Sequence, residues 1–175
     1  MNHKINIVLF GIGNVGSALI NKVLKERKSI ILEDHIDIRF PVITSSTIAF
    51  FEKEGANFSW EANFIQFGIP FKLENVFKYI QENELENVIA VDATNDGEFA
   101  KEYFDLLQNG LGVLSVNQSL AQLPPDFGRE INLAASIFGL NYKFIKLDKA
   151  DKHLAANKLF ESILEIAEKQ KALVL

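Results

Sequence analysis

The sequence contains no cysteine among its 175 residues. Disulfide bonds, thiolate metal sites and cysteine nucleophiles are therefore excluded, and with them the thiohemiacetal chemistry of phosphorylating aldehyde dehydrogenases. Histidine is scarce as well, and His3, His35 and His153 are too far apart to provide a metal-ligand spacing. We therefore expect exposed histidines and no metal site.

Arginine and long apolar runs are also rare. Only three of the 18 basic residues are arginine, so few planar guanidinium groups are available to bind phosphate or carboxylate. Any anion site must then depend on backbone amides. The net charge of −5 favours neither nucleic acid nor an anionic membrane as a partner. The apolar run from Ile5 to Phe10 is too short for a signal peptide or a membrane span, so we expect a cytoplasmic protein.

The length and the hydrophobic content of 48% suit one domain with its own core. Apolar spacing predicts strands at 5–10, 36–43, 88–92, 113–116 and 142–147. It predicts helices at 14–28, 74–81, 96–108 and 150–171, and a further helix between the Pro124–Pro125 pair and Gly139. This alternation indicates an α/β fold with a doubly wound, mostly parallel sheet in three layers, a Rossmann-like domain. We expect a single domain, with residues 1–147 as its core and 148–175 as a C-terminal helix packed on that core.

Three local features refine this expectation. Pro41 lies within the second strand and indicates a bulge or an edge position. The segment 47–71 is aromatic and lacks a period, so we expect a short helix and packed loop, with its aromatic side chains mostly in the core. The basic residues between Lys22 and Lys28 suit the C-terminus of the first helix.

A glycine-rich motif, Gly-Ile-Gly-Asn-Val-Gly, occupies residues 11–16 between the first strand and the first helix. Gly11 would permit a tight turn, Gly13 would leave room for a pyrophosphate, and Gly16 would let the helix approach the sheet. The amides at the start of the helix would then face the phosphates. This context predicts a dinucleotide site that includes Gly11, Ile12, Gly13, Asn14, Val15 and Gly16. The alternative is that the glycines serve only a close turn between strand and helix.

Small polar residues follow two later strands and provide further candidates. Ala93, Thr94 and Asn95 come after the strand 88–92, at the edge where sheets of this kind bind ligands. Thr94 and Asn95 could contact a ribose or a nicotinamide, although Asn95 or Asp96 could instead cap the next helix. Asn117 follows the strand 113–116 in the same crevice and could contact the ligand or form a turn.

The end of the second strand leaves the choice between NAD and NADP open. Ser46 and Thr47 lie there, without the acidic residue that binds a free ribose diol or the arginine that binds a 2′-phosphate. Asp37 is at a suitable distance along the sequence but falls inside the strand. We therefore expect Asp37 to be a structural or solvent-facing residue.

In this order the motifs resemble the homoserine dehydrogenase family, in the form fused to aspartokinase, over nearly the whole chain. The resemblance rests on segments 11–19, 35–39, 44–46, 91–94, 112–118 and 154–164. It implies an NAD(P)-binding domain of an oxidoreductase of amino-acid biosynthesis, which transfers hydride between NAD(P)H and aspartate semialdehyde or homoserine. On this basis Ser46, Thr47, residues 93–95 and Asn117 join residues 11–16 as cofactor contacts.

The sequence also departs from the family pattern. In the family a lysine follows the asparagine that matches Asn117, and here that position is Gln118; a basic residue often found after the family's second strand is Thr47 here. In the family, a substrate and dimerisation domain that holds the catalytic residues follows the strand that ends here near Leu147. The glycine-rich loop before the family's closing helix is replaced by residues 148–152. We therefore assign no catalytic residue and expect no competence in catalysis by this domain alone.

Three hypotheses follow. The chain could be an NAD(P)-binding domain that works with a protein partner supplying a catalytic domain. It could be a non-enzymatic, dinucleotide-dependent regulatory or interaction protein, or a structural relic that binds no dinucleotide. Gly13 favours the first two, because a relic would have no need for a residue without a side chain at that position. The oligomeric state is not predicted.

Overall fold

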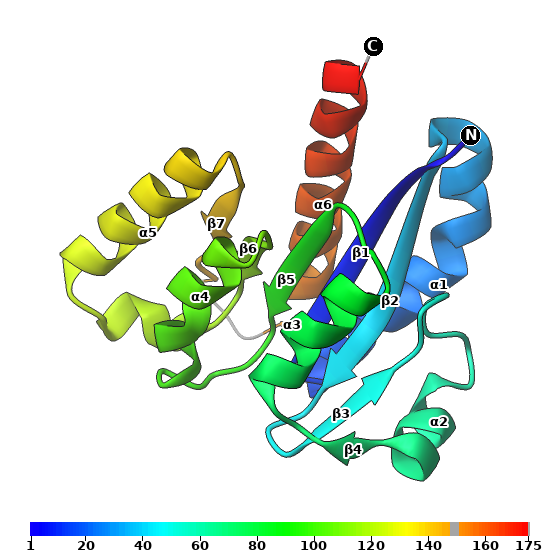
Figure 1. The fold of residues 1–175 in the computed structure, drawn as a ribbon, viewed down its shortest axis with the longest axis horizontal. Coiled ribbons are helices and arrows are strands. Elements are labelled where there is room, and N and C mark those ends of the chain that lie inside the picture. The colour runs from blue at the N-terminus through cyan, green and yellow to red at the C-terminus, as the bar shows by residue number, and fades with distance from the viewer. Residues whose placement is uncertain (148–150, 175) are drawn as a thin grey trace.

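The computed structural model describes residues 1–147 and 151–174, which form a sheet between two layers of helices (Figure 1). The strands are β1 (His3–Phe10), β2 (Ile36–Thr44), β3 (Ile48–Phe51), β4 (Ile69–Pro70), β5 (Val88–Asp92), β6 (Gly112–Ser115) and β7 (Tyr142–Phe144). The helices are α1 (Asn14–Asp34), α2 (Trp60–Phe67), α3 (Leu73–Glu82), α4 (Tyr103–Gln108), α5 (Pro125–Phe138) and α6 (Lys152–Val174). Two 3₁₀ helices, η1 (Phe99–Glu102) and η2 (Gln118–Gln122), precede α4 and α5.

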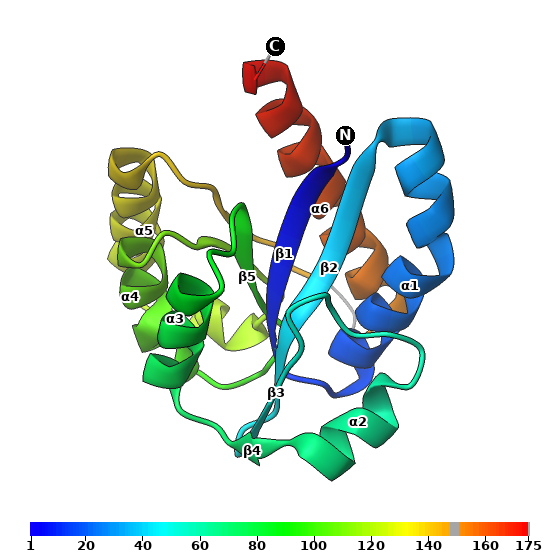
Figure 2. The same ribbon diagram turned by 45° about the vertical axis from the view of Figure 1, so that its right-hand side comes forward.

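The sheet has the strand order β4-β3-β2-β1-β5-β6-β7. β2, β1, β5, β6 and β7 run parallel, and β3 and β4 add an antiparallel edge next to β2. Figure 2 shows α1 and α6 on one face of the sheet and α3, α4 and α5 on the other. The predicted doubly wound α/β fold, with a mostly parallel sheet in three layers, is confirmed.

Strand β1 is apolar along most of its length because helices cover both of its faces. Ile5, Ile7 and Leu9 belong to the core cluster beneath α1 and α6, and Val8 and Phe10 belong to the cluster beneath α3, α4 and α5. All five side chains are at most 2% exposed. The central strand therefore joins two cores, and its carboxyl end is held firmly where the glycine motif begins.

Pro41 occupies a bulge within an interior strand. The pairing of β1 with β2 shifts between Asn6↔Arg39 and Val8↔Val42, which places two residues of β2 opposite one residue of β1. The prediction of a bulge is confirmed, and the alternative of an edge position is wrong because β2 lies between β1 and β3. The irregular register suits a residue that has no N–H to donate.

The segment 47–71 contains two strands that the sequence analysis does not predict. β3 and β4 are four and two residues long, too short for a recognisable alternation, and α2 is the expected short helix. Trp60 is buried, and its Nε1 donates to Asn21 Oδ1 at 3.0 Å. Phe58 and Phe67 are exposed, so the expectation of a core position is wrong for these two side chains.

Two helices differ from their predicted bounds. α1 continues to Asp34 because Ile30 extends the buried face that includes Val23, and His35 ends it in a left-handed conformation with φ 56°. The cations around Lys22 therefore lie inside the helix, and the prediction that they mark its end is wrong. The helix predicted at 96–108 begins later, first as η1 and then as α4.

Helix α6 packs against α1, and both cover the same face of the sheet (Figure 2). Ala155, Leu159 and Ile163 are fully buried in this contact layer. The predicted start of this helix at Ala150 lies outside the described residues, as do Asp148 and Lys149. The first described turn of α6 lies beside the glycine motif, where it contributes to the pocket described below.

Candidate functional site

A pocket of about 600 Å³ lies at the carboxyl ends of the parallel strands. This edge of a doubly wound sheet is where ligands bind, because the strand order reverses there and leaves a crevice between loops. The described lining residues are Gly11, Ile12, Gly13, Asn14, Val15, Ser45, Ser46, Ala93, Thr94, Asn95, Val116, Gln118, Leu147, Asp151, Lys152 and Ala155.

The three glycines of the motif have three different surroundings. Gly11 has φ +97°, a conformation that disfavours other residues, and its N–H donates to the Thr44 carbonyl at 2.9 Å. A Cβ on Gly16 would lie 1.9 Å from the Gly11 carbonyl oxygen, so this glycine allows α1 to touch the preceding turn. A Cβ on Gly13 would meet no described atom within 4 Å. Backbone conformation therefore explains Gly11 and packing explains Gly16, whereas Gly13 faces open space.

The start of α1 is suited to an anion. Gly13 is the N-cap and supplies no side-chain acceptor, and the first turn contains no acidic residue in this described segment. The first amides of a helix lack acceptors within the helix, and they carry the partial positive charge of its dipole. Asn14 and Val15 line the pocket beside the open space at Gly13. The arrangement fits a pyrophosphate held by backbone amides.

The end of β2 supplies hydroxyl groups. Ser45 and Ser46 line the pocket, whereas Thr47 is exposed and absent from the described lining. Ser45 Oγ accepts hydrogen bonds from the N–H groups of Thr47 and Ile48 at 3.3 and 3.0 Å, which fixes the turn between β2 and β3. No carboxylate from this end of β2 is present among the described lining residues.

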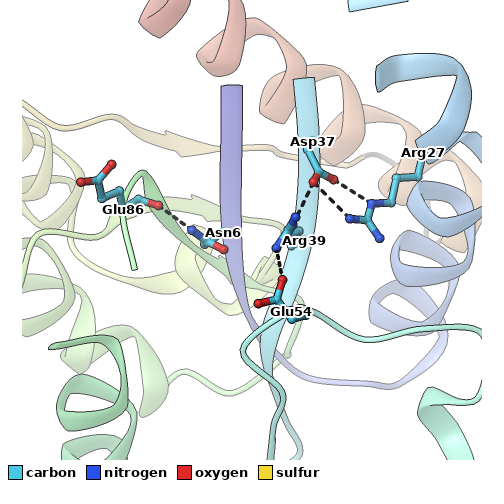
Figure 3. Close-up of polar contacts among 6 residues, drawn as sticks. All are labelled: Asn6, Arg27, Asp37, Arg39, Glu54 and Glu86. Carbon is cyan, nitrogen blue, oxygen red and sulfur yellow. Dashed lines mark hydrogen bonds and ion pairs between the residues drawn. The ribbon is translucent and has the colours of Figure 1, made fainter. Parts of the chain in front are cut away.

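Asp37 lies inside β2, away from the pocket (Figure 3). Its carboxylate accepts hydrogen bonds from Arg27 Nε at 2.7 Å and from Arg39 Nε at 2.9 Å, and Arg39 also contacts Glu54. Burial alone would raise the pKa of Asp37, but the two guanidinium groups outweigh burial and hold this pKa below its usual value. The expectation of a structural residue is confirmed, and the alternative of a solvent-facing residue is wrong because Asp37 is 4% exposed.

The loop after β5 contributes Ala93, Thr94 and Asn95 to the pocket, as predicted for this edge of the sheet. Asp96 lies outside the described lining, and its Oδ1 accepts the Glu98 N–H at 2.9 Å just before η1.

Asn117 is fully buried below the pocket, where its Oδ1 accepts the Ser119 N–H at 3.1 Å. The alternative that Asn117 forms a turn is thus confirmed by its position as the N-cap of η2.

A buried polar cluster lies beneath this loop, and the sequence analysis does not predict it. Asp92 Oδ1 accepts hydrogen bonds from the N–H and the hydroxyl of Thr94, and Asp92 Oδ2 accepts from Tyr103 and Asn117. Burial raises the pKa of Asp92, against the opposing effect of these hydrogen bonds. Burial and the neighbouring Asp92 charge also raise the pKa of Tyr103 and bring that of Tyr142 to about 12.

Gln118 is held by three hydrogen bonds to the backbone. Its Nε2 donates to the carbonyls of Val116 and Ile145 at 2.8 and 3.1 Å, and its Oε1 accepts the Leu147 N–H at 3.1 Å. The residue therefore joins the end of β6 to the segment after β7. A lysine at this position could not accept the Leu147 N–H, because an ammonium group has donors only.

The final wall of the pocket comes from Leu147 and the first turn of α6, which the sequence analysis does not include in the site. Asp151 Oδ1 accepts the N–H groups of His153 and Leu154, and these hydrogen bonds lower the pKa of Asp151. Asp151 and Lys152 are the charged side chains on the described part of the wall. The resemblance of 154–164 to a closing helix is the sequence signal that places this turn near the motif.

The described residues contain no group of three or more His, Asp or Glu side chains placed to hold a metal ion. His35 and His153 are exposed as expected, whereas His3 is half-buried with its Nε2 2.8 Å from Gln170 Oε1. None of the helices in the described part of the chain has both the length and the apolar character of a membrane span.

No family model matches the sequence. The chain is 28% identical over 115 residues to the bifunctional aspartokinase/homoserine dehydrogenase of Buchnera aphidicola, which covers 65% of this chain and 14% of that protein. It is 27% identical over 120 residues to the chloroplastic bifunctional aspartokinase/homoserine dehydrogenase 1 of Arabidopsis thaliana, with coverage of 67% and 13%. The chain thus spans about one seventh of the length of these relatives.

Solved structures share the fold. A homoserine dehydrogenase of S. aureus superposes with a TM-score of 0.59 and 19% identity, over 82% of this chain and 33% of that one. A hyperthermophilic archaeal homoserine dehydrogenase in complex with NADPH has a TM-score of 0.59 and 20% identity, over 81% of this chain and 43% of that one. A protein of unknown function from Candida auris has a TM-score of 0.64 and 18% identity, with coverage of 81% and 38%. Together with the curated relatives, these structures confirm the predicted resemblance to the homoserine dehydrogenase family.

Proposed function

Because the chain resembles the nucleotide-binding domain of homoserine dehydrogenases, we propose that it binds NAD or NADP in the pocket at the carboxyl ends of its strands. The observation that carries this proposal is the open space at Gly13 beside the uncapped start of α1. Backbone amides of residues 12–15 would hold the pyrophosphate without arginine. When bound, the nicotinamide supplies a centre that can donate or accept hydride.

From the lining residues at each end of the pocket we infer how the two halves of the dinucleotide would lie. In folds of this kind the adenosine ribose binds at the end of the second strand, here beside Ser45 and Ser46. The nicotinamide half would then extend over residues 93–95 and Gln118. The described wall at the end of β2 has no carboxylate that would repel a 2′-phosphate, so NAD and NADP are both candidates.

We further propose that the domain does not catalyse hydride transfer by itself. Reduction of an aldehyde needs a bound substrate and a proton donor near the developing alkoxide. At the nicotinamide end of the pocket, Gln118 is neutral and both N–H groups of its amide donate to backbone carbonyls, so it has no proton to give to an alkoxide. A protein partner that supplies a substrate domain would complete a dehydrogenase of the homoserine type.

A dinucleotide-dependent regulatory or interaction protein is the second candidate function. The hydrogen bonding of Gln118 supports this candidate as well, because the side chain connects two backbone segments of the pocket wall and has no charged group to offer to a reaction. The two candidates differ in turnover when a partner chain with a substrate domain is present. They share the prediction that the isolated chain binds a dinucleotide.

Calorimetric titration of the purified protein with NAD⁺, NADH, NADP⁺ and NADPH tests the binding proposal, with homoserine-dependent reduction assayed on the same sample. Gly13→Val should weaken the affinity at least about tenfold, because its side chain would fill the space of the pyrophosphate. Gly128→Val is a matched control, since Gly128 also has open space around its Cβ position but lies on α5. Equal affinity of wild type and Gly13→Val would refute the phosphate site.

A further inference from the structure

The cluster beneath the pocket floor connects segments that are distant in sequence. Asp92 ends β5, Tyr103 begins α4, Ser115 ends β6 and Asn117 precedes η2. Each of these four side chains is at most 1% exposed. Thr94 belongs to both the cluster and the pocket lining, so the cluster reaches the ligand site through this residue.

The hydrogen-bond directions match an ionised Asp92. Each of its oxygens accepts from one group that can only donate, the Thr94 N–H at 2.9 Å and the Asn117 amide at 3.0 Å. The Tyr103 hydroxyl lies 2.5 Å from Asp92 Oδ2 and 2.6 Å from Ser115 Oγ. With Asp92 ionised, the Tyr103 hydroxyl donates its single hydrogen to the carboxylate, and the Ser115 hydroxyl donates to the tyrosine oxygen.

This arrangement determines what the loop offers to a ligand. The Thr94 hydroxyl donates to Asp92 at 2.6 Å, and its oxygen accepts the Asp96 N–H at 3.2 Å. Asn117 Nδ2 also donates to the Asp96 carbonyl at 2.8 Å. The loop is therefore fastened at both ends, and the polar groups left to face the pocket belong to its main chain and to the Asn95 side chain.

We propose that Asp92 is a positioning residue for the nicotinamide half of the dinucleotide. It fixes the conformation of residues 93–96 through Thr94 and Asn117, and it has no contact with the ligand of its own. The inference rests on the proposed function. The inference predicts that a change at Asp92 weakens binding of the whole dinucleotide more than binding of its adenosine half. The adenosine half would bind near Ser46, which makes no described hydrogen bond to the cluster.

The test compares two ligands on Asp92→Asn. The first is whichever of NADH and NADPH binds wild type more tightly, and the second is ADP, which carries the adenosine half alone. The amide of the variant turns one acceptor into a donor that faces Tyr103 and Asn117, so the loop loses its fixed conformation. We expect the affinity for the dinucleotide to fall about tenfold and that for ADP to change by less than about twofold.

A second variant and a control keep the result interpretable. Tyr103→Phe removes one donor to Asp92 and keeps the packed ring, so it should show a smaller loss with the same selectivity, even if Asp92→Asn does not fold. Asp37→Asn alters a buried carboxylate far from the pocket lining and should leave the ratio of the two affinities unchanged. Equal losses for dinucleotide and ADP, or no loss, would overturn the inference. Absence of dinucleotide binding by wild type would instead reject the proposed function and the inference with it.

Discussion

Two carboxylates are buried at opposite ends of the sheet, Asp37 level with Lys4 at the start of β1 and Asp92 level with Phe10 at its end, and their surroundings differ. Asp37, in the first half of β2, lies between the guanidinium groups of Arg27 and Arg39 (Figure 3). Asp92, at the end of β5, is surrounded by four neutral donors, and no described lysine or arginine forms an ion pair with it. Against the effect of burial, the two guanidinium groups lower the pKa of Asp37, whereas burial raises the pKa of Asp92 against the opposing effect of its hydrogen bonds. The carboxylate of Asp37, far from the pocket, is balanced by two positive charges. The carboxylate of Asp92, beneath the pocket, is stabilised by hydrogen bonds from neutral groups.

The difference follows from what each carboxylate connects. Asp37 joins β2 to α1 through Arg27, and Arg39 extends the connection to Glu54 in the loop after β3. Burial would lower the pKa of Arg39, but Asp37 and Glu54 raise it. Asp92 joins a strand end to the loop that lines the pocket. Only the second network couples a buried charge to residues that a ligand would touch.

Asp37→Asn should produce the largest change in stability. It leaves two partly buried guanidinium groups with one acceptor between them, and we expect a loss of about 2 kcal/mol in the free energy of unfolding. Urea denaturation at neutral pH measures this loss. Asp92→Asn should lower the free energy of unfolding by less, because the variant removes a charge that burial disfavours. A larger loss for Asp92→Asn than for Asp37→Asn would contradict this comparison.

The pH dependence of stability should separate the two carboxylates. The lowered pKa of Asp37 means that its stabilising contribution is present above the unfolded value near 3.8 and is lost as the pH falls through the folded value. The raised pKa of Asp92 has the opposite sign, so its contribution is present at acidic pH and is lost as the pH rises from 3.8 through the folded value. Unfolding curves between about pH 3 and about pH 7 should therefore show that Asp37→Asn weakens the acid sensitivity of the protein and Asp92→Asn strengthens it. Parallel curves for the two variants would contradict this assignment.

The smallest effect concerns Tyr142, whose pKa of about 12 reflects burial first and the Asp92 charge second. Asp92→Asn should lower this pKa toward its ordinary value of 10, because the variant removes the negative charge and leaves the burial. Ultraviolet titration of tyrosine, with Tyr142→Phe to assign the signal, measures the change. Asp37→Asn should leave the Tyr142 titration unaltered, and an equal change in both variants would show that the Asp92 charge is not its cause.

Much of the fold could be predicted because its signals are local. The apolar run of β1 and the glycines after it identify a buried parallel strand followed by a helix. β3 and β4 could not be predicted in the same way, because strands this short are defined by pairing with β2 and with each other. The sequence predicts the end of α1 too early, because cations favour a helix end only weakly, whereas burial of Ile30 continues the helix.

In the candidate site, too, the features set by local sequence could be predicted and those set by distant contacts could not. The lining by residues 11–15, Ser46 and 93–95 follows from their places after strands, which the sequence displays. The partners of Asn117 do not follow, because Asp92 and the Asp96 carbonyl are more than 20 residues away and no periodicity links them. The wall formed by Lys152 likewise depends on how α6 packs against α1.

The amide of Gln118 has a mechanical consequence for the end of the pocket. The amide donates to the Ile145 carbonyl and accepts from the Leu147 N–H, as the peptide group of a neighbouring strand would. These two hydrogen bonds extend the strand pairing by one step beyond β7. The Leu147 amide should therefore exchange its hydrogen with solvent as slowly as the neighbouring strand, although Leu147 lies in no strand. The pocket wall at Leu147 is thus held to the sheet by a single side chain.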